Sequence, residues 1–207
     1  YFTMVAGQPA GKDFLSLAGP GFRDFTRIAA GEPALWRDVM LANMRHAAAL
    51  RIDHVLGFMR QFWVPRGAEG KAGAYVNFPI DGMIAVTAIE SRRQNCMVIG
   101  EDLGTIPDGL RERLSAARIL SYRVLWFERM GSGFRPPTDY PELALACLAS
   151  HDLPTFRGWR QSLDIAIDRG LGRIPPDAVS AREEARREEI AQLDSLSRAA
   201  SNGLQDA

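Results

Sequence analysis

Three short apolar runs in this chain of 207 residues each end at a motif that contains a carboxylate. The carboxylates are Asp53, Glu101 and Asp152, which lie about 50 residues apart, a spacing that fits successive strand–helix units with inserted loops. In a barrel of parallel strands, catalytic groups collect where the strands end. Cleavage of a glycosidic bond requires carboxyl groups in separate roles. The pattern therefore predicts a parallel α/β architecture that gathers three carboxylates for chemistry on a sugar bond.

The order of elements along the chain supports this architecture. Helical periodicity alternates with strand-like runs, and such alternation is typical of an α/β fold with a parallel sheet. The expected strands cover residues 48–52, 96–99, 122–127 and 143–149; the expected helices cover residues 35–49, 80–93, 107–117, a segment from 154, and 180–200. Residues 57–79 are rich in glycine and aromatic side chains and are predicted to form a loop.

The charge balance and the cysteines narrow the classes of function. Basic and acidic residues number 25 each, so the formal net charge is zero and predicts no electrostatic attraction for nucleic acid. No apolar run approaches the roughly 20 residues of a membrane-spanning helix, which predicts no membrane insertion. Cys96 and Cys147 lie in apolar runs and are predicted to be buried free thiols, as in a reducing, cytoplasmic compartment.

The first two carboxylates each have a catalytic and a structural interpretation. Arg51 and Asp53 share one face of a strand, so the guanidinium either favours an ionised, nucleophilic Asp53 or forms a structural ion pair with it. Gly100 leaves room before Glu101 either for a ligand or for close backbone packing. Glu101 is then either a catalytic general acid and base or simply part of a polar turn before the next helix. Asp102 is expected to point to the opposite side of the chain.

The third motif and the aromatic residues also allow two interpretations each. Asp152, with His151 as a donor beside it, stabilises positive charge at an anomeric carbon, or it caps the helix that Pro154 opens. Aromatic side chains between the first two motifs, among them Phe62 and Tyr75, offer stacking surfaces for sugar rings, or they belong to ordinary packing.

A different class of function uses the two His–Asp pairs as metal ligands. Asp53 with His54, and His151 with Asp152, would then serve a phosphohydrolase. Such ligands normally lie on helices, whereas both pairs here follow strand-like runs. His46 is the one further histidine in the sequence. This alternative is therefore weaker than the glycosidic one.

The motifs and the residues around them resemble a known family. They are similar to the 4-α-glucanotransferases, also called amylomaltases or disproportionating enzymes, and most of all to the proteobacterial type. The similar stretches are residues 41–44, 49–55, 73–76, 96–105, 121–125 and 151–155. The resemblance implies a retaining transglycosylase that acts on α-1,4-linked maltooligosaccharides without a metal or an organic cofactor. A plain α-glucan hydrolase of the same clan is the alternative within enzymes.

The resemblance also implies a role for each candidate residue. Asp53 would be the nucleophile that forms the glycosyl-enzyme ester, Glu101 the general acid and then base, and Asp152 the stabiliser of the transition state. Arg51 would support Asp53. The candidate substrate-binding residues are Arg51, His54, Tyr75 and His151.

The implied fold is the C-terminal part of a (β/α)8 barrel, because members of the family are much longer than this chain. Residues 1–34 are expected to form a loop or lid, residues 35–175 a partial barrel with all three carboxylates, and residues 176–207 a charged helix and tail. A partial barrel exposes unpaired strand edges. The 207 residues alone are therefore expected to be unstable or self-associating, and inactive.

Overall fold

The computed structural model describes residues 33–203, so the lid predicted over residues 1–34 lies outside it apart from the last two residues. The chain divides into two compact units. The first comprises residues 1–122 and 143–145, and the second comprises residues 123–142 and 146–207. Each unit has hydrophobic clusters of its own.

The chain contains a four-stranded sheet in the order β1-β4-β5-β8. Its strands are β1 (Ala49–Ile52), β4 (Met97–Gly100), β5 (Leu120–Val124) and β8 (Ala144–Cys147). β1 pairs in parallel with β4, and β4 pairs in parallel with β5. Ile52 is the register partner of Gly100, so β1 and β4 end level with each other. The predicted parallel sheet is confirmed.

Three helices supply half of the residues in the buried cluster of the first unit. They are α3 (Pro33–Met44), α4 (Ile80–Gln94) and α5 (Leu110–Ala116). α3 packs against α4, where Trp36 Nε1 donates a hydrogen bond of 2.8 Å to Thr87 Oγ1 and so gives both buried polar groups a partner. Apolar side chains of these helices, of β1 and β4 and of the 3-10 turn η3 (Val55–Phe58) form one buried cluster, which includes Met40, Met44, Ile52, Val55, Phe58, Met83, Val98, Leu110 and Leu114.

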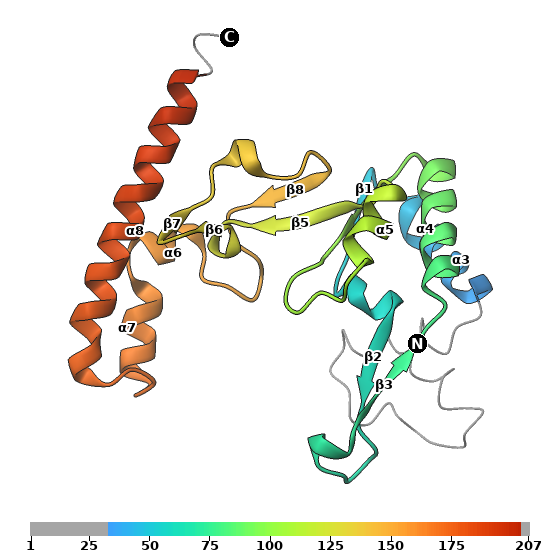
Figure 1. Cartoon of the computed structure of the whole chain (residues 1–207), viewed down its shortest axis with the longest axis horizontal. Coiled ribbons are helices and arrows are strands. Elements are labelled where there is room, and N and C mark those ends of the chain that lie inside the picture. The colour runs from blue at the N-terminus through green and yellow to red at the C-terminus, as the bar shows by residue number, and fades with distance from the viewer. Residues whose placement is uncertain (1–32, 204–207) are drawn as a thin grey trace. The chain divides into compact units, whose positions relative to one another are not determined.

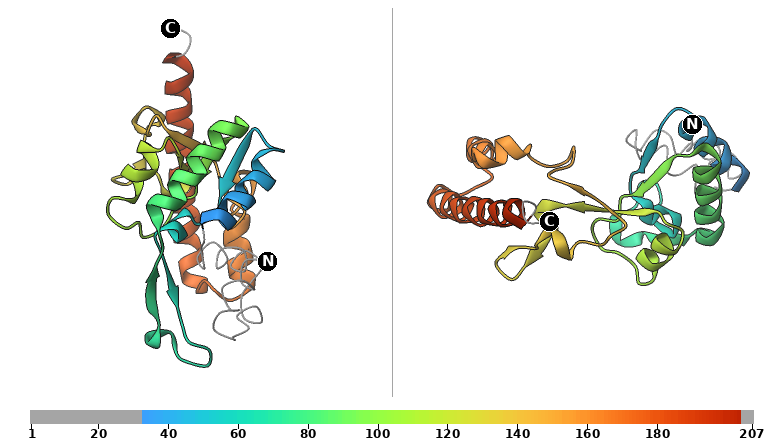
Figure 2. Two further views of the ribbon diagram at one scale, coloured as in Figure 1. Left: turned by 90° about the vertical axis from the view of Figure 1, so that its right-hand side faces the viewer. Right: turned by 90° about the horizontal axis from the view of Figure 1, so that it is seen from above.

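The segment 57–79, predicted to be a loop, contains a β-hairpin that projects from the sheet of the first unit (Figures 1 and 2). Its parts are β2 (Arg60–Trp63), η4 (Gly70–Ala72) and β3 (Ala74–Asn77). Phe62 and Tyr75 are register partners whose rings meet edge to face, with centroids 5.2 Å apart. The loop prediction was wrong because a long glycine-containing turn concealed two short strands, which the cross-strand pair of Phe62 and Tyr75 helps to stabilise.

The second unit contains a short antiparallel hairpin and three helices. Its elements are η5 (Leu125–Phe127), β6 (Arg129–Met130), β7 (Gly133–Phe134), η6 (Pro137–Asp139), α6 (Phe156–Arg160), α7 (Leu163–Gly170) and α8 (Pro176–Gly203). The strand predicted to reach Phe127 ends at Val124, where the chain turns into η5. Ile190, Leu193 and Leu196 of α8 pack against the cluster around Phe134 and Trp159.

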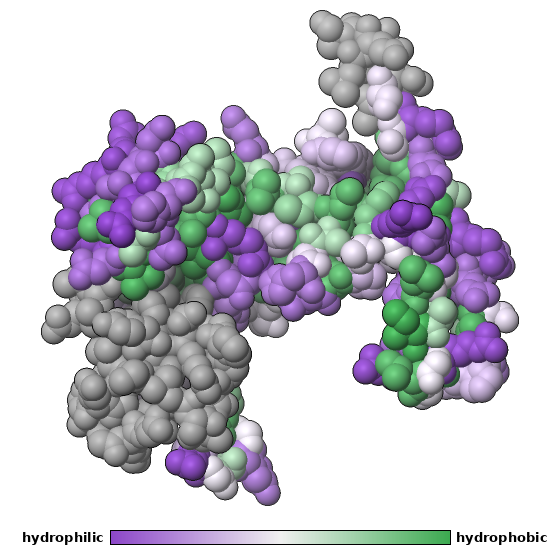
Figure 3. Space-filling view, turned by 180° about the vertical axis from the view of Figure 1, so that it is seen from behind, coloured by the Kyte–Doolittle hydropathy of each residue, from purple (hydrophilic) through white to green (hydrophobic). Residues whose placement is uncertain are grey.

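Helix α7 of the second unit exposes apolar side chains on one face and buries others. Leu163 and Ile167 on α7 and Leu171, its C-cap, recur at helical spacing and expose half or more of their surfaces. Figure 3 shows an apolar patch over this helix. Ile165, from the same helix, is buried with Ile174 and other residues. Within residues 33–203, no helix has the length and apolar character needed to cross a membrane.

Candidate active site

Two of the predicted catalytic carboxylates lie at the ends of neighbouring strands. Asp53 follows the last residue of β1, and Glu101 follows the last residue of β4. Backbone pairing continues past both ends, because the Glu101 amide donates to the Ile52 carbonyl at 2.9 Å and the Val55 amide donates to the Glu101 carbonyl at 3.0 Å. The structure therefore brings Asp53 and Glu101 to the same edge of the sheet.

Arg51 and Asp53 form the ion pair that their spacing predicted. Arg51 Nη1 donates to Asp53 Oδ1 at 2.7 Å, and the guanidinium carbon lies 4.7 Å from the centroid of the Tyr122 ring. The Asp53 side chain is 61% exposed. An ion pair this open to solvent contributes only about 0–1 kcal/mol to stability. Structural stabilisation is therefore a weak reason for the pair, and the carboxylate is accessible to a ligand.

The Glu101 carboxylate is oriented by two backbone amides. The His54 amide donates to Oε2 at 2.8 Å, and the Leu103 amide donates to Oε1 at 2.9 Å. His54 adopts a left-handed backbone conformation with φ of 49°, which directs the chain from β1 into η3. The turn after β1 thus supplies one donor and the turn after β4 supplies the other, so the end of the first strand helps to fix the side chain of the second.

Gly100 serves close packing. A Cβ atom at this position would lie 3.1 and 3.2 Å from the two Cγ atoms of Val55 and 3.3 Å from Cγ2 of Ile119. These distances are shorter than ordinary van der Waals contact. Of the two predicted reasons for the glycine, the structure supports close packing beneath the site over space for a ligand.

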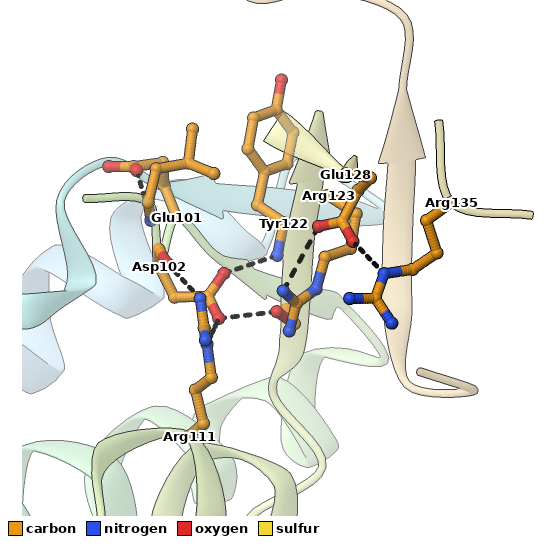
Figure 4. A network of polar contacts seen from close by, with 9 residues as sticks. Glu101, Asp102, Arg111, Tyr122, Arg123, Glu128 and Arg135 are labelled. Atoms are coloured by element: carbon orange, nitrogen blue, oxygen red, sulfur yellow. Dashed lines mark hydrogen bonds and ion pairs between the residues drawn. The ribbon is translucent and has the colours of Figure 1, made fainter. Parts of the chain in front are cut away.

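Asp102, next to Glu101 in the chain, makes a network of contacts that the sequence did not reveal. It points away from Glu101, as predicted, and is fully buried. Its carboxylate accepts hydrogen bonds from Ser121 Oγ at 2.6 Å, from Arg111 Nε at 2.8 Å and from the Tyr122 amide at 2.9 Å (Figure 4). Burial favours a higher pKa for this carboxyl, but these hydrogen bonds and the Arg111 charge outweigh burial and hold its pKa below the usual value.

His151 and Asp152 belong to the second unit and are both exposed. His151 Nε2 lies 3.3 Å from Asp152 Oδ2, and the Asp152 amide donates to Ser150 Oγ at 3.3 Å. The helix-cap interpretation of Asp152 is wrong. Thr155 is the N-cap of α6, and its Oγ1 accepts the Gly158 amide at 3.1 Å. The short helix begins after the threonine, so the carboxylate of Asp152 takes no part in capping it.

The other predicted binding residues lie in the first unit. His54 is exposed beside Asp53. Tyr75 lies on the hairpin with 58% of its surface exposed, and the Arg60 guanidinium carbon lies 4.2 Å from the centroid of its ring. Phe62, which packs against Tyr75, exposes 45% of its surface. The hairpin therefore presents aromatic surface to solvent, where a sugar ring can stack against it.

The cysteines differ from each other. Cys96 is buried, as predicted, and burial raises the pKa of its thiol. Cys147 is only half-buried, so the prediction for this residue was wrong, because β8 lies last in the sheet order and exposes half of its residues. In the part of the chain that the structure describes, no group of three or more His, Cys, Asp or Glu side chains is placed to hold a metal ion.

A protein-family model described as 4-α-glucanotransferase matches residues 22–206 of the sequence. The chain belongs to the 4-α-glucanotransferase family. A 4-α-glucanotransferase of Haemophilus influenzae is 39% identical over 162 residues, which cover 78% of this chain and 23% of that protein. A 4-α-glucanotransferase of Mycobacterium bovis is 33% identical over 177 residues, which cover 83% of this chain and 24% of that protein. The chain thus spans about a quarter of the length of these curated relatives.

Two solved structures of amylomaltases are similar to this chain in fold. An amylomaltase from Corynebacterium glutamicum matches with a TM-score of 0.75 and 30% identity, covering 86% of this chain and 25% of that chain. An amylomaltase from Streptococcus agalactiae, in complex with acarbose, matches with a TM-score of 0.52 and 20% identity, and the match covers 69% of this chain and 30% of that chain. At this identity the match supports the fold alone. The predicted fold class, α/β and part of a (β/α)8 barrel, is confirmed.

For a member of the 4-α-glucanotransferase family, the edge formed by β1 and β4 has suitable chemistry. It presents an accessible carboxylate paired with a guanidinium and a second carboxylate oriented by two amides. Membership of this family also removes the basis for the phosphohydrolase alternative. One feature of the sequence could have pointed to Asp102. It is an acidic residue directly after the candidate general acid and base, and its side chain is expected on the opposite face of the strand, toward the core.

Proposed function

We propose that this protein is a retaining transglycosylase that moves α-1,4-glucan segments between maltooligosaccharides. The observation that carries the proposal is the pair Asp53 and Glu101 at the ends of two adjacent parallel strands, in a chain of the 4-α-glucanotransferase family. A retaining mechanism needs its nucleophile and its acid about 5–5.5 Å apart. Neighbouring strands lie roughly 4.8 Å apart, so adjacent strand ends supply a separation of that order.

The first half-reaction forms a covalent intermediate. A carboxylate oxygen of Asp53 attacks the anomeric carbon of the donor and forms an ester bond as the glycosidic bond breaks. Glu101, protonated at this stage, gives its proton to the departing sugar oxygen and becomes a carboxylate. The products are a glycosyl-Asp53 ester and a shorter glucan with a free 4-hydroxyl group.

The second half-reaction transfers the glycosyl group. The Glu101 carboxylate removes the proton from the 4-hydroxyl of an acceptor glucan, and the acceptor oxygen attacks the anomeric carbon. The ester bond breaks, so Asp53 regains its carboxylate and Glu101 its proton. Two successive inversions leave the α configuration unchanged. If water replaces the acceptor, the same steps give hydrolysis, which is the alternative function.

The remaining candidate residues assist these steps. Arg51 holds Asp53 in place through their ion pair and balances its charge when the ester breaks. Asp152 stabilises the positive charge that develops at the anomeric carbon. His54 and His151 donate hydrogen bonds to sugar hydroxyls, and Tyr75 offers its exposed ring for stacking against a sugar.

Product analysis distinguishes transfer from hydrolysis. The protein encoded by the complete reading frame that contains these residues, called the intact protein below, is incubated with maltotriose. Transfer gives a ladder that includes glucans longer than maltotriose, whereas hydrolysis gives only shorter sugars. A ladder supports the proposal, and shorter sugars alone favour the hydrolase.

Substitution of the nucleophile tests the mechanism. Asp53→Ala is expected to lower the turnover of maltotriose by at least about 10⁴-fold, the scale on which activity falls when an attacking group is removed. Asp81→Ala is the matched control, because Asp81 is also an exposed carboxylate paired with an arginine, Arg113, in the same unit. The control should retain full activity. Substantial turnover by Asp53→Ala would remove the nucleophile assignment.

We also propose that the protein works in the cytoplasm. Support comes from the two free cysteines, since such thiols persist in a reducing compartment. Cell fractionation with an antibody against the intact protein tests this, and recovery from the periplasm or the medium would contradict it.

A further inference from the structure

Asp102 ties the end of β4 to two neighbouring elements. Its buried carboxylate accepts from Ser121 and Tyr122 on β5 and from Arg111 on α5 (Figure 4). A buried carboxylate with several donors is confined to one position, because loss of a donor leaves its charge poorly compensated. The backbone at the end of β4 is therefore fixed directly beside Glu101.

Arg111 also reaches the backbone of the residue that it pairs with. Its Nη2 donates to the Asp102 carbonyl at 3.0 Å. That carbonyl belongs to the peptide group whose N–H, on Leu103, donates to Glu101 Oε1 at 2.9 Å. The peptide group is planar, so an interaction that fixes the direction of its C=O also fixes the direction of its N–H. Arg111 thus holds one side of a peptide group whose other side orients the Glu101 carboxylate.

We infer that Asp102 and Arg111 are positioning residues, which orient Glu101 for proton transfer by fixing the peptide group between Asp102 and Leu103. The inference rests on the proposed role of Glu101 as acid and base. Proton transfer requires close and well-aligned partners, and a misplacement of about 1 Å can cost roughly 100-fold in rate. The two residues act through the peptide group and do not touch the sugar.

The charge state of Asp102 fits this task. Although burial opposes ionisation, the hydrogen bonds from Ser121, Tyr122 and Arg111 and the Arg111 charge keep the pKa of Asp102 below its usual value. The carboxylate therefore stays ionised throughout the neutral range and retains Arg111. Glu101 can change its protonation state in each half-reaction while its support keeps the same charge.

Tyr122 connects the same network to the nucleophile. Its amide donates to Asp102, and its ring lies beneath the Arg51 guanidinium, which pairs with Asp53. One residue of β5 therefore contacts the supports of both candidate catalytic carboxylates. A shift of Asp102 is expected to disturb Glu101 first, through one peptide group, and Asp53 only through the longer path.

The experiment compares two donors that differ in their need for an acid. Maltotriose loses a sugar alkoxide, which must be protonated as it leaves, whereas α-maltotriosyl fluoride loses fluoride, which leaves without that proton. The specificity constant kcat/KM covers the steps up to release of the first leaving group. A defect confined to Glu101 as an acid therefore lowers kcat/KM for maltotriose far more than for the fluoride.

Four variants of the intact protein are measured with both donors: Asp102→Asn, Arg111→Met, Arg113→Met and Asp53→Ala. Asp102→Asn and Arg111→Met are expected to lower kcat/KM for maltotriose by about 10- to 100-fold and to change it by no more than about threefold for the fluoride. Arg111 has 44% of its side chain exposed, so its replacement leaves no large cavity. Arg113→Met is the matched control on α5, since it breaks an exposed ion pair with Asp81 and should change neither value.

The outcomes separate the inference from the proposed function. Equal losses on both donors would show general damage to the fold, and unchanged values for both donors would show that Glu101 needs no such support; either result overturns the inference. In the same assay, the Asp53→Ala variant must lose its activity on both donors. If Asp53→Ala keeps its activity on the fluoride, the proposed mechanism fails, whatever the Asp102 and Arg111 variants do.

Discussion

The ends of β4 and β8 carry the same sequence pattern, an apolar run followed by a carboxylate, but they differ in local organisation. At the end of β4, two backbone amides orient Glu101, and the neighbouring Asp102 is buried with donors from two other elements. Asp152 lies in the loop after β8, five residues beyond the last strand residue, Cys147. Its side chain is 77% exposed, and His151 Nε2 lies 3.3 Å from its Oδ2.

The position of each strand in the sheet accounts for the difference. β4 lies between β1 and β5, so the turn after it receives donors from both neighbours. β8 is last in the order of the described sheet and has β5 on one side. A carboxylate directly after an inner strand can therefore be fixed by both neighbouring strands, whereas one in the loop beyond an edge strand has fewer neighbours to hold it. This contrast predicts different consequences for matched substitutions.

The largest expected effect on stability is at Asp102. Asp102→Ala should lower the free energy of unfolding of the intact protein by about 2–4 kcal/mol, because it leaves the Tyr122 amide and the Ser121 hydroxyl without their buried acceptor and breaks the pair with Arg111. Urea denaturation followed by circular dichroism measures the change. Asp152→Ala is the control and should alter stability by less than about 0.5 kcal/mol, since its side chain is exposed. Equal losses for the two variants would contradict the contrast.

The second prediction concerns activity at Asp152. Asp152→Asn should lower the turnover of maltotriose by about 10²–10³-fold, the usual effect of removing one group that stabilises charge in a transition state. Its free energy of unfolding should match that of the unmodified protein. Thr155→Ala provides the reverse case, with a loss of about 1 kcal/mol in stability through the missing helix cap and little change in turnover. An active Asp152→Asn variant would exclude the proposed role.

Much of the fold could be predicted from the sequence, because apolar runs and helical periodicity reflect burial directly. The alternation of elements gave the parallel sheet, and that sheet explains why Asp53 and Glu101, far apart in sequence, lie at one edge. The ion pair of Arg51 and Asp53 also followed from local geometry, since residues two apart on a strand share a face. These features depend on short stretches of chain.

The features that were missed depend on contacts between distant residues. The role of Asp102 requires Arg111 on α5 and Ser121 on β5, whose arrangement around the end of β4 no local pattern reveals. The hairpin depends on the pairing of Phe62 with Tyr75 across a long turn. Helix capping by Thr155 was missed because Asp152 and Thr155 are both good capping residues, and the sequence alone did not decide between them.

The third prediction tests the packing beneath the organised strand end. Gly100→Ala should destabilise the protein by about 1–3 kcal/mol, because the added methyl group overpacks against Val55 and Ile119. Thermal unfolding measures the loss. Gly70→Ala, in the turn of the hairpin, is the control, since a Cβ there meets no heavy atom within 4 Å. A neutral Gly100→Ala variant would mean that the backbone beneath Glu101 gives way easily, which would weaken the argument for a fixed site.

The smallest expected effect is on the dependence of stability on pH, and its sign follows from the lowered pKa of Asp102. Hydrogen bonds and the Arg111 charge outweigh burial, so the folded protein holds this carboxyl below its ordinary value of 3.8. A group with a lowered pKa stabilises the fold above its unfolded pKa, and the stabilisation disappears as the pH falls through the folded pKa. The free energy of unfolding should therefore fall from about pH 4 downward, by up to about 1.4 kcal/mol per pH unit from this one group. Asp102→Asn should remove that part of the slope and Asp152→Asn should leave it in place; identical slopes for the two variants would show that the buried network at the end of β4 is not what sets the acid response.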